Sequence, residues 1–194
     1  MSTENNILTI DTGAGIVKPE QKQLSPLPLY DEHHPMLKQS IPEYRGSLPS
    51  DVLTVLVNRL KMTMRKFGGI GLSANQCGVF ERVFVIGTDQ FQIACINPKI
   101  LSHSDEIIRG PEGCLSYPGL YLHIPRYKWI EVEFYTEMGE LKRVKLEGLS
   151  ARCFQHELDH MNGVRFEDHV GPASLMMARQ KQQKRIKKIV RRKK

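Results

Sequence analysis

Residues 155–160 read Gln-His-Glu-Leu-Asp-His, and the H-E-x-x-H run within them constrains this chain more than any other feature. Four residues of an α-helix turn through about 400°, so His156 and His160 lie on one face, one turn apart. Two imidazoles placed in this way can bind one divalent metal, and Glu157 beside them can act as a general base. The run therefore predicts a metal-binding helix, against the alternative of an ordinary solvated amphipathic helix.

A catalytic metal commonly has three protein ligands, and the third does not follow this run in the usual way. In the best-known zinc hydrolases the pattern continues as H-E-x-x-H-x-x-G-x-x-H. Here Gly163 fits the glycine, but Phe166 occupies the last position, which excludes that class. Glu167, Asp168 and His169 follow too closely to have the usual helix-to-helix separation. The third ligand is therefore expected upstream, and a cysteine is the first candidate.

Four scattered cysteines in a chain of 194 residues without a secretion signal indicate reduced thiols rather than a disulfide framework. Cys153 shares the helix face of the histidines, but it precedes His160 by about 10.5 Å of axial rise, too far for both to bind one ion. For Cys153, as for Cys77 and Cys95, the role of a small buried apolar residue is favoured. Cys114 stands apart, because the prolines around it indicate a rigid segment rather than a core strand.

Three blocks stand in one order along the chain, and their residues are Gly69-Ile70-Gly71-Leu72-Ser73-Ala74-Asn75-Gln76, Glu112-Gly113-Cys114-Leu115-Ser116 and Gln155-His156-Glu157-Leu158-Asp159-His160. Together, at these separations, they resemble the peptide deformylase family, which removes the formyl group from the N-terminal methionine of new polypeptides. The resemblance runs from about Leu27 to Asp168. It implies a metal-dependent hydrolase that acts on nascent formyl-methionine peptides and releases formate.

The resemblance also implies a role for individual residues. In that family the cysteine of the middle block and the two histidines bind the metal, which are here Cys114, His156 and His160. The glutamate of the third block is the general base, here Glu157. The glutamine that closes the first block helps to bind the formyl oxygen, here Gln76.

These residue types suit the reaction. A thiolate and two neutral imidazoles leave a fourth metal position open for water, whose pKa the metal lowers. Glu157 would take a proton from that water, which attacks the formyl carbon, and would later pass it to the leaving amine. The metal, the Gln76 amide and the backbone N–H of Leu115 would stabilise the negative charge that develops on the formyl oxygen.

Four residues are predicted to bind the substrate, namely Gly69, Ile70, Gly71 and Tyr121. The two glycines are also typical turn residues, and they let a substrate backbone approach closely. Tyr121 stands where well-known bacterial members of the family carry an arginine that contacts the substrate backbone. The way in which this chain holds a peptide beyond its first residue is therefore an open question.

Three further positions bear on the site. Ser73 stands where the family commonly has alanine, and a buried hydroxyl needs a hydrogen-bond partner. Arg126 matches the pattern of the family and can pair with Glu112, against the alternative of a solvated arginine. The resemblance implies one divalent metal, with Fe²⁺ as the native ion and Zn²⁺ or Ni²⁺ able to replace it. Thiolate and imidazole ligands by themselves favour Zn²⁺ over Fe²⁺ in affinity.

The order of elements indicates a single α+β domain, in which the motif helix packs against antiparallel or mixed β-sheets. Apolar residues at helical spacing from Leu53 to Met64, after a capping Ser50 or Asp51, predict a core helix. Strands are expected at residues 82–86, 92–96, 129–135 and 141–146, with a turn at residues 138–139. The motif helix is expected to span residues 150–161.

The charge is concentrated at one end of the chain. Residues 173–194 contain ten Lys or Arg and no acidic residue, whereas the rest carries 18 basic and 21 acidic residues, so the tail supplies the net charge of +7. A thin apolar stripe at Ile186, Ile189 and Val190 predicts a basic C-terminal helix. Such a helix can bind ribosomal RNA, as the resemblance suggests, or it can simply be solvated.

The remaining predictions concern organisation and location. Residues 1–25 are polar and without periodicity, and they are expected to form a flexible arm before a catalytic domain at residues 26–172. Without an apolar run of membrane-spanning length or a visible secretory signal, a cytoplasmic protein is expected. Two other classes of protein explain the sequence less well. A zinc peptidase has no reason for a Cys114 ligand, and a purely RNA-binding protein would not explain the three blocks.

Overall fold

The structure is a computed structural model that describes residues 24–192. In chain order the elements are η1 (Pro35–Lys38), α1 (Asp51–Lys66), β1 (Gly71–Ser73), η2 (Ala74–Cys77), β2 (Val83–Gly87), β3 (Gln92–His103), β4 (Ile107–Gly113), β5 (Tyr121–Tyr127), β6 (Trp129–Tyr135), β7 (Leu141–Glu147), α2 (Gly148–Met161), η3 (Phe166–His169) and α3 (Pro172–Arg192), where η marks a short 3₁₀ helix. The predicted α+β class is confirmed, and every strand pairing in the described part is antiparallel.

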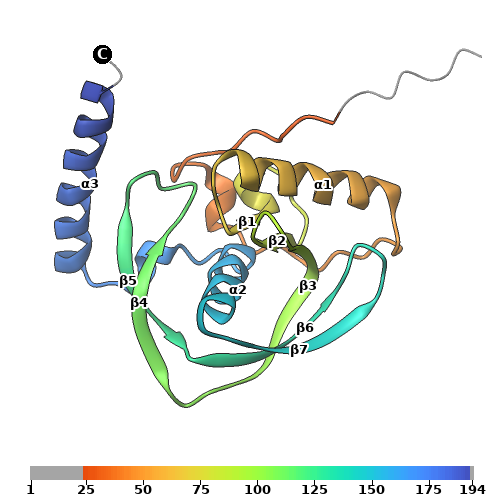
Figure 1. Ribbon diagram of the computed structural model, residues 1–194. Helices are drawn as coiled ribbons and strands as arrows, with labels where there is room; N and C mark the ends of the chain where they lie inside the picture. The colour runs from red at the N-terminus through yellow and green to blue at the C-terminus, as the bar shows by residue number, and fades with distance from the viewer. Residues whose placement is uncertain (1–23, 193–194) are drawn as a thin grey trace, which may run out of the picture.

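The strands form two sheets, and the larger one lies between two helices (Figure 1). Its order is β1-β2-β3-β6-β7, while β4 and β5 form a separate hairpin. Strand β2 is buried on both faces because its side chains alternate between two cores. Val83 and Val85 belong to the core that α1 covers, and Phe84 and Ile86 belong to the core that α2 covers.

Both predicted helices form for the reasons that the sequence suggested. Ser50 caps α1, since its Oγ accepts a hydrogen bond from the Leu53 backbone N–H at 3.4 Å. Helix α2 begins at Gly148, two residues before the expected start, and ends at Met161 as expected. Phe154 of α2 packs edge-on against Phe84 of the sheet, with ring centroids 5.0 Å apart. This contact places the motif helix against the larger sheet.

The four expected strands are present, but two differences are informative. Strand β3 continues to His103 instead of ending at residue 96. The chain passes the Asn97-Pro98 pair through register shifts, with Asn97 at a φ of 51°, so the strand bends there and does not stop. The hairpin of β4 and β5 was not expected, and it brings Gly113 opposite Tyr121.

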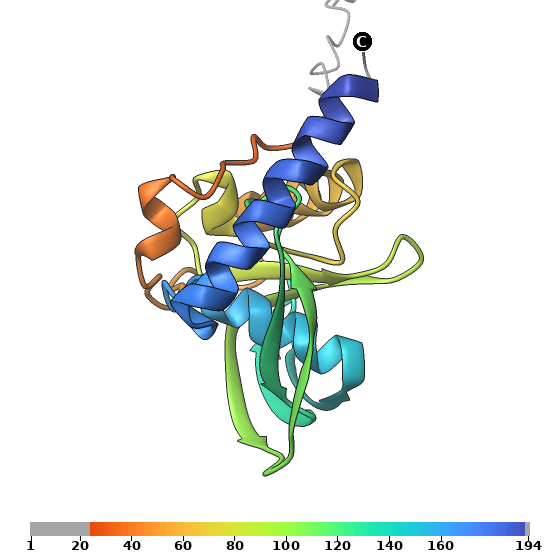
Figure 2. The same ribbon diagram turned by 90° about the vertical axis from the view of Figure 1, so that its left-hand side faces the viewer.

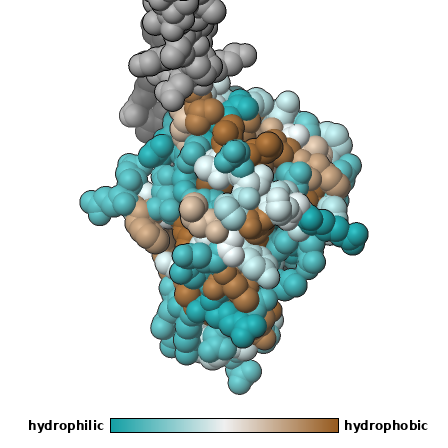
Figure 3. Space-filling model, turned by 90° about the vertical axis from the view of Figure 1, so that its right-hand side faces the viewer, coloured by the Kyte–Doolittle hydropathy of each residue, from teal (hydrophilic) through white to brown (hydrophobic). Residues whose placement is uncertain are grey.

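The C-terminal helix α3 lies beside this hairpin (Figures 1 and 2). The basic tail is therefore helical through Arg192, as predicted. The arm predicted at residues 1–25 lies outside the described residues, except for Leu24 and Ser25. Between residues 24 and 192, no helix combines the length and the apolar character needed to cross a membrane. On the face seen in Figure 3, apolar side chains lie in groups among hydrophilic ones.

Candidate active site

Helix α2 presents both histidines of the H-E-x-x-H run toward the hairpin. The rings of His156 and His160 lie one helical turn apart, with centroids separated by 5.1 Å and planes inclined at 77°. Both residues are buried, at 7% and 1% exposure. Burial, reinforced by His156, lowers the pKa of His160 to about 3, so its imidazole is neutral and keeps a lone pair for a cation.

Cys114 follows the last residue of β4 and completes a cluster of ligand atoms with the two histidines. Its Sγ lies 3.3 Å from Nε2 of His160. The ligand atoms of Cys114, His156 and His160 all lie within 4.8 Å of one another, and in the described residues no other group of three or more such side chains comes as close. One thiol and two imidazoles are a donor set that suits Zn²⁺ or Fe²⁺, so these residues fit a transition metal.

A buried ion-pair network holds His156 in place. Glu112 of β4 lies 3.0 Å from Nδ1 of His156, and it accepts hydrogen bonds from Arg126 at 2.9 and 3.0 Å and from Arg152 at 2.8 Å. Burial alone would raise the pKa of Glu112, but the bonds from His156 and Arg126 outweigh it and lower the pKa to about 2. Burial alone would lower the pKa of His156, but its bonds to Cys114 and Glu112 raise it. An ionised Glu112 accepts the Nδ1 proton, so Nε2 is the atom that would bind a metal, in exchange for its own proton. The predicted pairing of Arg126 with Glu112 is thus present.

Glu157 is buried at 3% exposure, and its Oε2 has no hydrogen-bond partner among the described residues. Burial raises the pKa of this carboxyl to about 7. A carboxylate with a free oxygen and a pKa near neutrality is suited to accept a proton and to return it. The position of the Glu157 side chain requires a glycine at residue 71. A Cβ on Gly71 would collide with Oε1 of Glu157 and would lie 2.8 Å from the Cys153 sulfur.

Gln76 directs its amide nitrogen toward the ligand cluster. Its Oε1 accepts a hydrogen bond from the Ser73 backbone N–H at 3.0 Å. The Ser73 hydroxyl lies 3.0 Å from the same oxygen and 2.8 Å from Oδ1 of Asn75, so these two acceptors share its one proton. These contacts leave Nε2 of Gln76 to donate to the Cys114 sulfur at 3.3 Å and to the Ser116 hydroxyl at 3.1 Å. The buried hydroxyl of Ser73 therefore has the partner that it needs, and it orients Gln76.

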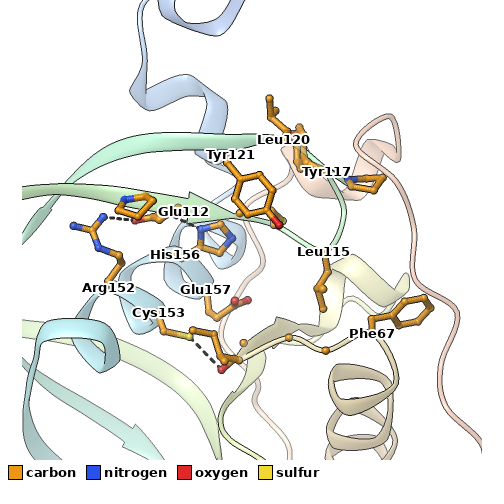
Figure 4. Close-up of a pocket in the computed structure, with 18 of the residues that line it drawn as sticks. Phe67, Glu112, Leu115, Tyr117, Leu120, Tyr121, Arg152, Cys153, His156 and Glu157 are labelled. Carbon is orange, nitrogen blue, oxygen red and sulfur yellow. Dashed lines mark hydrogen bonds and ion pairs between the residues drawn. The ribbon is translucent and has the colours of Figure 1, made fainter. Parts of the chain in front are cut away.

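These side chains surround one cavity of about 470 Å³ (Figure 4). It is lined by residues 67–71, 76, 111–115, 117–121, 149, 152, 153, 156 and 157. The lining includes Gly69, Ile70, Gly71 and Tyr121, which the sequence assigned to substrate binding, together with Gln76, Cys114, Leu115, His156 and Glu157. His160 is not part of the lining, but its Nε2 lies 3.3 Å from the sulfur of Cys114, which lines the cavity. The structure thus brings every predicted site residue to this cavity or directly beside it.

Some residues of the cavity were not expected from the sequence. Arg152, one turn before His156 on α2, binds Glu112 and the backbone oxygens of Ile108 and Ile124. Its spacing of four residues from the first histidine was a usable signal. Leu149, at 66% exposure, also reaches the cavity, and no sequence pattern marked it. Cys153 is buried and donates to the Ile70 oxygen at 3.3 Å, away from the ligand cluster.

Comparison with known proteins gives a consistent result. The family model described as "Polypeptide deformylase" matches residues 26–175. The peptide deformylase of Thermotoga sp. (strain RQ2) is 40% identical over 131 residues, which cover 68% of this chain and 80% of that protein. The crystal structure of a peptide deformylase from Synechococcus elongatus in complex with actinonin has a TM-score of 0.76 at 33% identity, covering 93% and 94% of the two chains. The Met-Ala-Ser-bound enzyme of Acinetobacter baumannii has a TM-score of 0.71 at 29% identity, covering 75% of this chain and 98% of that one.

Proposed function

The chain belongs to the peptide deformylase family, and on this premise we propose that it hydrolyses the formyl group from the N-terminal formyl-methionine of nascent polypeptides by a metal-dependent mechanism. One observation carries the proposal. A thiol and two imidazoles converge beside a buried carboxylate with a free oxygen, at the edge of a single cavity. A cation site, a proton acceptor and room for a substrate are what amide hydrolysis of this kind requires.

The proposed ligands of the divalent metal are Cys114, His156 and His160, with Fe²⁺ as the native ion and Zn²⁺ or Ni²⁺ able to replace it. When bound, the metal supplies positive charge that polarises the formyl oxygen and makes a water molecule more acidic. The surrounding protein orients the ligand side chains and sets their protonation state. Glu112 orients His156 through its 3.0 Å contact, and burial keeps His160 neutral.

Glu157 is the proposed general base. It accepts the proton of the attacking water on its free oxygen and then delivers that proton to the departing α-amine of methionine. Gln76 is proposed to donate a hydrogen bond from Nε2 to the formyl oxygen, helped by the backbone N–H of Leu115. The contacts of Ser73 with Oε1 of Gln76 support this role, because they fix which end of the amide points toward the cavity.

The peptide is proposed to lie along residues 69–71. Strand β1 is at the edge of the larger sheet, and residues 69–71 line the cavity. An extended peptide can therefore lie beside this backbone and pair with it in the manner of an added strand. Tyr121, at 56% exposure, closes the opposite side from the hairpin.

A direct assay tests this function. The protein, purified without oxygen and loaded in turn with Fe²⁺, Ni²⁺ or Zn²⁺, should release formate from formyl-Met-Ala-Ser, and removal of the metal with a chelator should abolish the reaction. Cleavage of the internal Met-Ala bond without formate release would point instead to a peptidase. If none of the three metal forms releases formate, the proposal is wrong.

The C-terminal helix is proposed to bind ribosomal RNA, which would place the enzyme beside nascent chains in the cytoplasm. Lys181, Lys184 and Lys187 are exposed on α3, and residues 173–194 contain no acid to compensate them. The positive charge of Arg179 is compensated, because this residue pairs with Glu32 and Glu167 of the body. Enzymatic activity alone does not require this contact, so it is tested separately.

A further inference from the structure

The side of α3 that faces the body contacts one segment of the cavity lining. This segment, Tyr117–Tyr121, is called the wall segment here, and all five of its residues line the cavity. It follows Cys114 and leads into β5, so it connects a proposed metal ligand to the second strand of the hairpin. Figures 1 and 2 both show α3 alongside this hairpin. The C-terminal helix is therefore a neighbour of the substrate cavity.

Two side chains of α3 bind the backbone of the wall segment. Gln182 is buried at 6% exposure, and its Nε2 donates to the Pro118 oxygen at 2.9 Å. Arg185 donates from Nη1 to the Gly119 oxygen at 3.1 Å. Gly119 has a φ of +77°, and a Cβ there would lie 3.7 Å from Gln182 and 3.8 Å from Ile186, so helix and segment are in close contact. Consecutive carbonyl groups of the segment are thus held by consecutive turns of one helix.

Arg185 also contacts Tyr121, the residue of the hairpin that is predicted to bind substrate. Its guanidinium lies 4.9 Å from the centroid of the Tyr121 ring, within the range of a cation–π interaction. The Tyr121 ring also lies against Gly113, where a Cβ would come within 3.0 Å of it. Tyr121 is therefore held between the residue that precedes Cys114 and the C-terminal helix. A shift of α3 would change where this half-exposed ring faces the cavity.

The beginning of α3 is anchored independently of these contacts. Arg179 pairs with Glu32 and with Glu167, the latter at 2.7 Å. Leu175 and Ala178 pack against the small core that includes Tyr117 and Leu120. The helix is thus fixed to the body at one end, and it can hold the wall segment with the next two turns.

We propose that Gln182 and Arg185 are positioning residues for substrate binding, which hold the wall segment so that Tyr121 faces the peptide residues that follow the formyl-methionine. This inference rests on the proposed function for its substrate. Gln182 and Arg185 bond to Pro118, Gly119 and Tyr121 and to none of the proposed reacting groups, which are the metal ligands, Glu157, Gln76 and the Leu115 backbone N–H. The effect should therefore fall on binding rather than on catalysis. It should also grow with the length of the peptide.

The variants Gln182→Ala and Arg185→Ala test this, alone and together, in the full-length protein. Two exposed residues give matched controls, Gln183→Ala on α3 for the amide and Lys38→Ala on η1 for the charge. The double variant should raise KM for formyl-Met-Ala-Ser by about three- to tenfold, as expected for one or two hydrogen bonds, with kcat and metal content unchanged. KM for formyl-methionine amide should change little. The conservative Arg185→Lys, which keeps a cationic donor, should recover most of the affinity.

Hydrogen exchange supplies a measurement that does not depend on activity. Backbone amides in the peptide that covers residues 114–121 should exchange several-fold faster in the double variant than in the controls, while those of α2 stay unchanged. If wild-type protein releases no formate, the proposed function fails, but exchange still decides whether α3 holds the segment. If amides of residues 114–121 exchange equally fast in the double variant and in the controls, the inference is overturned. It is also overturned if exchange is faster in the double variant but its KM for each substrate equals that of wild type. An equal loss of kcat on both substrates would indicate a merely structural role and would overturn it too.

Discussion

At the scale of single residues, Glu157 is the group on which the proposed chemistry depends most. Replacement of Glu157 by Gln keeps the shape but removes the proton acceptor. Because burial raises the pKa of Glu157 to about 7, the native carboxyl can both take and return a proton near neutral pH. Glu157→Gln should bind metal normally and lose on the order of 10²–10⁴ in kcat, the usual share of general acid–base catalysis. Near-normal turnover in a metal-replete variant would contradict the assignment.

Cys114 and Cys153 are expected to differ in their effect on metal binding. Cys114→Ser should weaken metal binding severely, because its thiolate lies among the ligand atoms. Cys153→Ser should leave the metal content near one per chain, since the Cys153 sulfur contacts the Ile70 oxygen instead. Metal analysis of both purified variants checks this. The idea fails if metal is lost with Cys153 and kept without Cys114.

Gly71 provides a steric test of the same site. An added methyl would collide with Oε1 of Glu157 and crowd the Cys153 sulfur. Gly71→Ala should therefore displace the base and reduce kcat by about 10²-fold, the cost of a small misplacement of a catalytic group. Gly171→Ala is the control, because a methyl at that position meets no atom within 4 Å. Equal activity of the two variants would show that Glu157 has room to move.

Residue patterns explain why part of the site was predictable. His156, Glu157 and His160 follow from a local helical spacing, which is fixed by backbone geometry. Cys114 and Gln76 required the family resemblance, because the contacts that bring them to α2 are made by distant parts of the chain. The orienting role of Ser73 depends on a side-chain rotamer within a tight turn. A single sequence carries no signal for that.

At the scale of elements, the sequence predicted the long strands and missed the hairpin beside the site. Strands β4 and β5 contain Pro111 and Pro125, which normally argue against a central strand. They are tolerated because the hairpin is a two-stranded sheet, in which each strand keeps one free edge. The alternation of buried Leu122, Ile124 and Arg126 was the signal that could have revealed β5.

Glu112 of the hairpin bonds to both His156 and Arg152 of α2, and this leads to an element-scale prediction. Glu112→Ala would leave Arg126, Arg152 and His156 without their shared partner. Loss of one member of a buried charge network should lower the free energy of unfolding by about 3–5 kcal/mol. Metal affinity should also fall by about 10- to 100-fold, because His156 loses its orienting acceptor. Denaturant unfolding and metal titration measure the two effects, and a variant with normal stability and normal affinity would contradict this view of the network.

At the scale of the whole molecule, the sequence located the positive charge correctly but not the packing of the helix that carries it. A tail read as a separate basic segment would be expected to be dispensable for catalysis. In the structure α3 is held by Glu167, just before the helix, and by Glu32 and the wall segment, which lie far from it in the sequence. Truncation after Pro172 would therefore disturb the cavity as well as remove charge. A test of RNA binding must change the charge and leave the buried side of the helix intact.

The exposed lysines of α3 meet that requirement. Lys181, Lys184 and Lys187 are exposed, so their replacement by Gln keeps the contacts of Gln182 and Arg185. The triple variant should bind ribosomes more weakly, and the slope of log affinity against log salt should become shallower by up to about 0.9 for each phosphate contact that is lost. Turnover of formyl-Met-Ala-Ser should stay at the wild-type level, because these side chains do not line the cavity. A control variant carries three exposed lysines of the body changed in the same way, at Lys38, Lys66 and Lys145. If both triple variants co-sediment with ribosomes equally and with the same salt dependence as wild type, α3 does not bind RNA through its charge, and its role is confined to the cavity.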